Sequence, residues 1–218
     1  MQSLRFEPVS TALLVVDLQN SYCHSNGCLA KVGIDVTPHR RIISNVQRLI
    51  KVCRGLEVSI IWILQEHFVN DRTLSLHKIP TTKQKLKTPD LAARGTWEAE
   101  LIDEMKMLVD PSDYMVKKSR SSAFYNTNLE QILKMLGIKT TIVTGISTNI
   151  CVESTVRDAS FRDYDVVVVS DCVASPKEHL HKTTLENVDL YFGAVLSSEA
   201  VLVALSQANQ ETTSKQAS

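Results

Sequence analysis

The stretch TTIVTGISTNICVESTVRDAS, residues 140–160, decides the fold. It begins as an apolar run rich in β-branched residues, passes through small polar residues, and continues as a helical pattern from Cys151 onward. Apolar residues on consecutive positions are typical of a strand buried on both faces, as in a parallel sheet. A strand followed directly by a helix indicates a βαβ crossover. The stretch therefore predicts an α/β protein with a parallel sheet.

The same alternation of strand and helix recurs along the chain. Further strands are predicted at Thr11–Leu18, Val58–Leu64, Tyr114–Lys118, Asp165–Asp171 and Ala194–Leu196. Helical patterns occur at residues 40–56, 127–137 and 151–163, and a last helix is expected after the final strand. We expect a three-layer αβα sandwich with a central, mostly parallel, Rossmann-like sheet of about six strands.

Length and composition indicate one globular domain. The 218 residues accommodate a single domain, which we place at residues 1–206. Residues 207–218 are polar and lack aromatics, so a disordered tail is predicted there. The 24 basic and 24 acidic residues balance, and no long run of either sign occurs. A nucleic-acid or anionic-membrane surface is therefore not expected, because both require a basic patch.

Two further features concern the cellular compartment. The N-terminal sequence lacks a signal-peptide pattern, and no apolar stretch approaches the ~20 residues that span a bilayer. The five cysteines are an odd number spread through a chain of globular size, which is not a disulfide framework. A cytoplasmic, reducing location is the interpretation.

Candidate site residues lie where strands end, because ligands of open α/β sheets bind outside the carboxyl ends of the strands. Asp17 follows the first apolar run, although one acidic residue there is also a common helix cap. Adjacent Lys117 and Lys118 point to opposite faces of a strand, so at most one faces a cleft. Cys151 stands at a predicted helix start, where amides and the helix dipole favour a thiolate. A buried structural cysteine is an equally good interpretation. The long segment 66–95 is interpreted as a binding loop.

These three residue types form a coherent set for acyl transfer. A thiol with a pKa of ~8.5 needs a base to take its proton, and a carboxylate can serve. A nearby ammonium stabilises whichever anion forms. Helix-start amides can hold the oxyanion of a tetrahedral intermediate. The set predicts attack of a thiol on a carbonyl carbon, followed by hydrolysis of a thioester.

Four stretches, LLVVDLQN, KSRSSAF, LGIKTTIVTGISTNICVESTVRDA and YDVVVVSD, resemble the isochorismatase-like cysteine hydrolase superfamily over nearly the whole chain. The resemblance implies that Asp17 is the base, that Lys118 stabilises charge, and that Cys151 is the nucleophile. It selects Lys118 over Lys117 through the pattern K-x-R-x-S-A-F. It also implies a cis peptide between Ile146 and Ser147, an oxyanion hole made by the amides of Ser147 and Cys151, and a homo-oligomer, either dimer or tetramer.

Within the superfamily, the sequence is similar to the ureidoacrylate amidohydrolase branch, through TPDLAARGTWEAELIDEM and NVDLYFG. This implies a small-molecule substrate with a ureido or carbamoyl amide. Gln19 and Asn20 are candidate substrate-binding residues, although turn formation is an equal alternative for Asn20. Trp97, Phe124 and Tyr125 are candidate pocket walls, with core packing an equal alternative for Trp97 and Phe124. Other hypotheses are a nicotinamidase or another small-amide hydrolase, and a non-catalytic binding protein on the same scaffold. A thiol redox protein is a further alternative, but the sequence contains no Cys-x-x-Cys motif.

No metal and no cofactor are expected. Nicotinamidases carry a metal-binding aspartate after the second strand, where this chain has Gln65. His67 and His77 remain, but two histidines without the carboxylate make a poor metal site. The cluster Cys23, His24 and Cys28 lacks a second ligand pair at a usable spacing, so no zinc site is predicted there.

Overall fold

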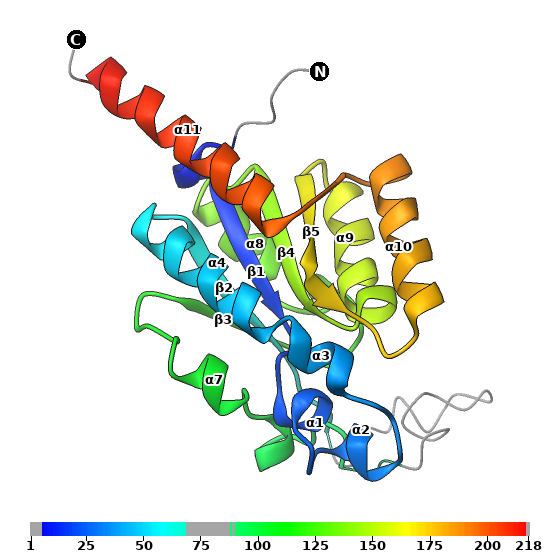
Figure 1. Cartoon of the computed structure of the whole chain (residues 1–218). Helices are drawn as coiled ribbons and strands as arrows, with labels where there is room; N and C mark the ends of the chain where they lie inside the picture. The colour runs from blue at the N-terminus through cyan, green and yellow to red at the C-terminus, as the bar shows by residue number, and fades with distance from the viewer. Residues whose placement is uncertain (1–5, 69–87, 89, 217–218) are drawn as a thin grey trace.

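The computed structural model describes residues 6–68, 88 and 90–216. Its centre is a six-stranded sheet with the order β3-β2-β1-β4-β5-β6, and every neighbouring pair is parallel (Figure 1). The strands are β1 (Thr11–Val16), β2 (Ser59–Gln65), β3 (Tyr114–Lys118), β4 (Thr140–Ile146), β5 (Asp165–Ala174) and β6 (Ala194–Leu196). The predicted three-layer α/β fold is therefore confirmed, with a parallel sheet.

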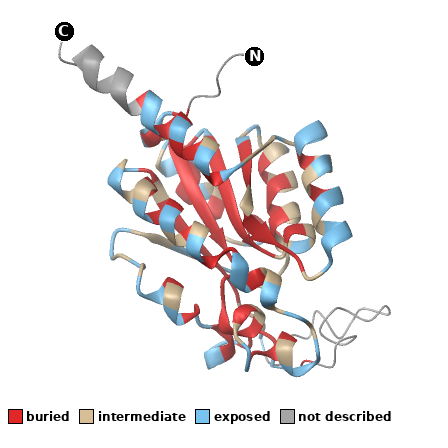
Figure 2. Cartoon of the chain, in the orientation of Figure 1, coloured by how far each residue is buried: buried red, intermediate tan, exposed pale blue. Residues whose placement is uncertain are grey.

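Each face of the sheet carries its own hydrophobic core, because successive strand side chains point to opposite faces. Leu13 and Val15 of β1 pack in the core that contains α4 (Ile43–Gly55) and α11 (Ser198–Gln216). Leu14 and Val16 face the other side, in the core formed with α8 (Leu129–Met135), α9 (Glu153–Ser160) and α10 (Glu178–Tyr191). Figure 2 shows the buried strands between helices whose outer faces are exposed. Burial on both faces explains the consecutive apolar residues in the sequence.

The strand order places a crevice at one end of the sheet. The chain proceeds from β1 outward through β2 to β3, and then returns to β4 on the other side of β1. Such a reversal point opens a crevice outside the carboxyl ends of the two neighbouring strands. Asp17 follows β1 directly and Cys151 follows β4, so both belong to this crevice.

Several helices were not predicted from the sequence. The short ones are η1 (Pro8–Ser10), α1 (Asn20–Cys23), α2 (Cys28–Lys31), α3 (Thr37–Arg41), η2 (Trp97–Ala99), α7 (Asp103–Lys106) and η3 (Thr148–Val152). The 14-residue helix α10 was also missed, since only Thr184 and Val188 are buried in it and no clear apolar stripe marks its sequence.

The end of the chain differs from the prediction. The sequence predicts a disordered tail from residue 207, whereas α11 continues as helix to Gln216. Extending an existing helix fixes one residue per added hydrogen bond and needs no new nucleus, so good helix formers such as Gln, Glu and Ala continue it. Residues 217 and 218 lie outside the described part. Among the described residues, no helix has both the length and the apolar character needed to cross a bilayer.

Candidate active site

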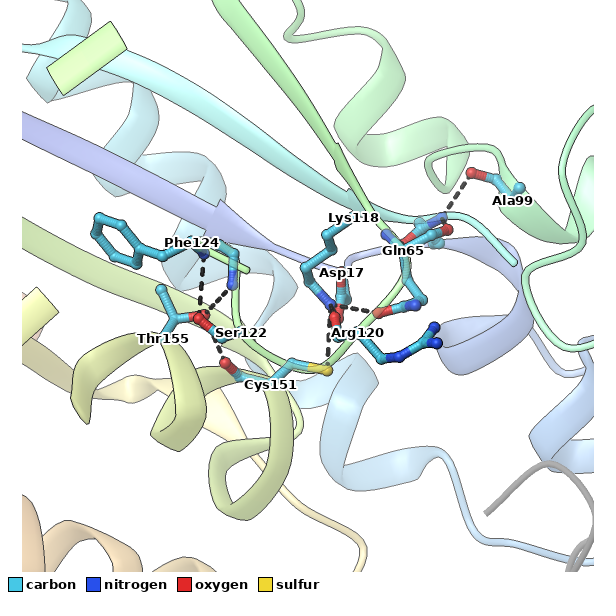
Figure 3. A network of polar contacts seen from close by, with 11 residues as sticks. Asp17, Gln65, Ala99, Lys118, Arg120, Ser122, Phe124, Cys151 and Thr155 are labelled. Carbon is cyan, nitrogen blue, oxygen red and sulfur yellow. Dashed lines mark hydrogen bonds and ion pairs between the residues drawn. The ribbon is translucent and has the colours of Figure 1, made fainter. Parts of the chain in front are cut away.

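The structure brings together the three residues on which the sequence argument depends. Asp17 follows β1, Lys118 ends β3 and Cys151 lies in η3 after β4. The Nζ atom of Lys118 is 2.8 Å from Asp17 Oδ2 and 3.3 Å from Cys151 Sγ (Figure 3). Asp17 and Cys151, which are 134 positions apart in the sequence, thus meet at one end of the sheet. The predicted arrangement of carboxylate, ammonium and thiol is present.

The ammonium of Lys118 is held at the centre of this group. Its side chain is wholly buried, and it also donates to Gln65 Oε1 at 2.5 Å and to the Arg120 carbonyl at 3.3 Å. Burial by itself lowers the pKa of Lys118, but the charges and hydrogen bonds of Asp17 and Cys151 outweigh it, and the pKa lies above its ordinary value. Lys118 is therefore a cation at neutral pH.

The choice between the two adjacent lysines is settled by the alternation of the strand. Lys117 points away from the crevice, and its Nζ atom lies 2.6 Å from Glu66 Oε1 with 55% of its side chain exposed. Lys118 points inward to Asp17. The K-x-R-x-S-A-F pattern therefore identified the inward-facing lysine.

The thiol of Cys151 is protonated in the resting site. Burial raises its pKa to about 12, the Asp17 carboxylate acts in the same direction, and the Lys118 ammonium only partly opposes them. Contrary to the sequence-based expectation, Cys151 is the fourth residue of η3 and does not stand at a helix start. Asp17, Lys118 and Cys151 together have zero net charge, both before and after a proton moves from the Cys151 thiol to the Asp17 carboxylate. No additional charge is then buried, so Asp17 is well placed to serve as the base.

Replacing Asp17 with asparagine should separate thiol reactivity from catalysis. Because the carboxylate raises the pKa of Cys151, its removal should leave the Lys118 ammonium to pair with the sulfur and lower that pKa. We expect Asp17→Asn to react faster with iodoacetamide at neutral pH, while hydrolysis falls by about 10³-fold or more because the base is lost. Mass spectrometry of the Cys151 peptide against time measures the first effect. Slower alkylation in the variant would contradict this view of the thiol.

The turn between β4 and Cys151 is shaped by close contact with β1. Gly145 has φ of 108°, and a Cβ atom there would lie 2.0 Å from the carbonyl oxygen of Val16. Only glycine fits this position. The peptide bond between Ile146 and Ser147 is cis, as the resemblance implies. After it, the η3 turn carries Cys151 to the cavity wall.

A cavity of about 550 Å³ opens next to the thiol. Its polar wall includes Asp17, Gln65, Ser147 and Cys151, and its apolar wall includes Ile146, Ile150, Leu29 and Leu180. Of the predicted binding loop, His67 and Leu91 line this cavity, whereas residues 69–87, including His77, and residue 89 lie outside the described residues. A cavity of this size fits a small molecule.

The substrate-binding role predicted for Gln19 is not supported by its position. Its side chain is fully buried and does not line the cavity. The Nε2 atom donates to the carbonyls of Gln65 and Ala99 at 2.8 and 2.6 Å, and Oε1 accepts from the Gln65 amide at 2.8 Å. Gln19 therefore stabilises the backbone at the end of β2 through hydrogen bonds.

The other four predicted substrate contacts are also placed elsewhere, since none of them lines this cavity. Asn20 donates to the Trp97 carbonyl at 2.9 Å, and the Trp97 ring packs edge-on against His24. Phe124 is buried against Tyr164, which is the core-packing alternative. Tyr125 is 55% exposed. In each case the local sequence does not reveal which way the side chain turns.

Cavity residues that the sequence did not single out as binders include Tyr22, Gln65 and Lys177. Gln65 was noted only as the residue that replaces a metal-binding aspartate, and here its oxygen is bound to Lys118. Cys23 and Cys28 are both buried thiols with raised pKa values, chiefly because of burial. Across the described ranges no three His, Cys, Asp or Glu side chains gather as metal ligands would, and the absence of a metal from the reaction stays a prediction.

Comparison with known proteins agrees with this geometry. Residues 11–200 match the isochorismatase domain family. The chain belongs to the isochorismatase family. The predicted superfamily is thereby confirmed, and with it the prediction that the protein is a hydrolase.

Solved structures of the family resemble the chain along most of its length. A cysteine hydrolase from Pseudomonas syringae pv. phaseolicola 1448A is 26% identical with a TM-score of 0.78, covering 93% of this chain and 95% of that one. N-carbamoylsarcosine amidase from Thermoplasma acidophilum is 25% identical with a TM-score of 0.69, covering 87% and 96%. A nicotinamidase from Bacillus subtilis is 23% identical with a TM-score of 0.71, covering 86% and 99%, and shares the fold.

Proposed function

We propose that this isochorismatase-family protein is a cysteine-dependent amidohydrolase that cleaves a C–N bond of a small ureido or carbamoyl amide, releasing ammonia or an amine. The observation that carries the proposal is the contact of one buried ammonium with both the Asp17 carboxylate and the Cys151 sulfur at the wall of a small cavity. The similarity to an N-carbamoylsarcosine amidase supports the choice of bond.

Asp17 moves the proton in this mechanism. Its Oδ2 atom is bound to Lys118, whereas its Oδ1 atom is buried without a hydrogen-bond partner. Oδ1 is therefore the atom that accepts the thiol proton as the Cys151 sulfur attacks the substrate carbonyl carbon. The C–N bond of the tetrahedral intermediate then breaks, and Asp17 gives the proton to the departing nitrogen.

Water completes the cycle. Asp17 removes a proton from a water molecule, the hydroxide oxygen attacks the thioester carbon, and the C–S bond breaks to return the Cys151 thiol with the proton from Asp17. In both tetrahedral intermediates the oxyanion requires hydrogen-bond donors, and we assign the amides of Ser147 and Cys151 to this role. Such a donor is worth about 3–4 kcal/mol of transition-state stabilisation.

The unoccupied hydrogen-bonding capacity of Gln65 supports a ureido group. Its Oε1 atom is engaged by Lys118, so its Nε2 atom is directed elsewhere, and this buried atom has no partner. An orphaned buried donor at a cavity wall favours a ligand with an acceptor oxygen at that point. Arg120 and Lys177 add positive charge to the wall, which favours a ureido compound that carries a carboxylate.

A substrate panel tests the proposal. Wild-type protein is incubated with ureidoacrylate, N-carbamoyl amino acids, biuret and nicotinamide, and ammonia is measured. We expect a kcat/KM for the best ureido compound at least about tenfold above that for nicotinamide, because nicotinamide has no carboxylate for Arg120 or Lys177. Preferential hydrolysis of nicotinamide would favour the nicotinamidase alternative. Binding of ureido compounds without any ammonia release would favour a binding protein.

A further inference from the structure

The buried ring of His39, in α3, contacts two residues that line the cavity. The ring is fully buried. Its Nδ1 atom is 2.8 Å from the carbonyl oxygen of Tyr22, and its Nε2 atom is 3.3 Å from Ser147 Oγ. Tyr22 and Ser147 both line the cavity, one from α1 and the other from the turn after β4. The imidazole therefore spans the space between the helical wall and the turn that carries the nucleophile.

The two partners determine the tautomer of this ring. A carbonyl oxygen only accepts hydrogen bonds, so Nδ1 must carry the hydrogen. Burial lowers the pKa of His39 below its ordinary value, although the Tyr22 carbonyl and the Asp35 carboxylate act in the opposite direction. The neutral ring then has a lone pair on Nε2. The Ser147 hydroxyl must donate to it, so the hydroxyl hydrogen turns toward His39.

We propose that His39 is a positioning residue, which holds the Ser147 side chain at the cavity wall with its oxygen available only as an acceptor. This inference rests on the proposed function, in which the substrate carries an N–H group beside the scissile carbonyl. The Ser147 oxygen then accepts from that N–H, while the amide of the same residue faces the carbonyl oxygen. His39 thus acts through Ser147 and does not touch the substrate.

Nitrogen NMR tests this role without any need for activity. The protein contains six histidines, and ¹⁵N-histidine labelling with a His39→Gln variant assigns the relevant pair of resonances. At pH 7 we expect the chemical shifts of a neutral ring with hydrogen on Nδ1. Ser147→Ala should shift the Nε2 resonance as its hydrogen bond is lost. The proposal would be refuted if the His39 ring carried its hydrogen on Nε2 or were an imidazolium. It would also be refuted if the Nε2 resonance did not change in Ser147→Ala.

Kinetics of a double-mutant cycle provide the second test. His39→Gln and Ser147→Ala should each lower kcat for the best ureido substrate about tenfold with little change in KM, as expected for one hydrogen bond used in the transition state. The double variant should lose no more than either single variant, because both changes break the same connection. Independent, multiplying losses would show that His39 supports the fold only.

Control measurements keep the two proposals apart. His179 of α10 is exposed and does not line the cavity, so His179→Gln should retain wild-type kcat. If His39→Gln does not fold, the proposal is tested by the change of the His39 Nε2 resonance in Ser147→Ala alone. The His39 resonances are then assigned by replacing the other histidines one at a time. If wild type hydrolyses no ureido compound while the NMR pattern is found, the proposed function fails and the His39–Ser147 connection stands.

Discussion

Replacing Cys151 with alanine is expected to reduce hydrolysis of the best ureido substrate by at least about 10⁴-fold. Removing the nucleophile of a triad leaves only the contribution of binding and oxyanion donors. Ammonia release at saturating substrate over long incubations measures the loss. The fold should persist, because the change removes a single sulfur atom at the cavity wall, with an expected cost within about 1 kcal/mol.

A buried cysteine supplies the matched control. All five cysteines lie within the described residues, and Cys151 is the one that is not buried. Cys172 is fully buried in the core beside α4 and α11, and burial raises the pKa of its thiol. Cys172→Ala should therefore lower the free energy of unfolding by about 1 kcal/mol or more and leave kcat unchanged. Retention of a tenth or more of the activity in Cys151→Ala would end the thioester mechanism.

The four inner strands β1, β2, β4 and β5 were predictable because their burial leaves a direct signal in the sequence, whereas the edge strands β3 and β6 are only partly buried. The predicted bounds of β3 and β6 coincide with those observed, and those of the other strands agree except near their ends. A strand covered on both faces must be apolar at consecutive positions, and few other structures impose that pattern. The catalytic candidates followed from this, because parallel strands direct their carboxyl ends to one edge of the sheet.

The cavity wall could not be predicted in the same way. Whether a polar side chain faces a ligand or the protein depends on partners far along the chain. The amide of Gln19 meets the backbone of Gln65 46 residues away, and Ser147 meets His39 108 residues away. His39 lies in a five-residue helix without periodicity, so no local pattern marks it. The upward shift of the Cys151 pKa was not predicted, for a related reason. A helix start is visible in sequence, whereas burial next to Asp17 is not.

Replacing Lys118 with methionine is expected to affect both stability and activity. The substitution removes the cation that contacts Asp17, Gln65 and Cys151, and it leaves a carboxylate that is 2% exposed without its partner. Breaking a buried ion pair on one side costs about 3–5 kcal/mol. Hydrolysis should fall below detection, because no positive charge then stabilises the thiolate. Urea unfolding and the ammonia assay measure the two effects.

The pH of the unfolding measurement matters for this comparison. The pKa of Lys118 is raised in the folded protein, so its contribution to stability is fully present below the pKa of an unfolded lysine, about 10.4, and is lost only as the pH rises through the folded value. Measurements at pH 7–8 therefore report the intact pair. Lys117→Met is the matched control, since Lys117 is 55% exposed, its pair with Glu66 is worth only about 1 kcal/mol, and neither residue lines the cavity.

The double variant Asp17→Asn, Lys118→Met separates the electrostatic cost from other effects of the substitution. Removing both members of the pair leaves neither Asp17 nor Lys118 as an unpaired buried charge, so the double variant should unfold at a higher urea concentration than Lys118→Met alone. It should nevertheless be inactive, because both the base and the ammonium are absent. A double variant as unstable as Lys118→Met would show that lost packing, rather than an unpaired Asp17, causes the destabilisation. Activity in either variant would remove Lys118 from the mechanism.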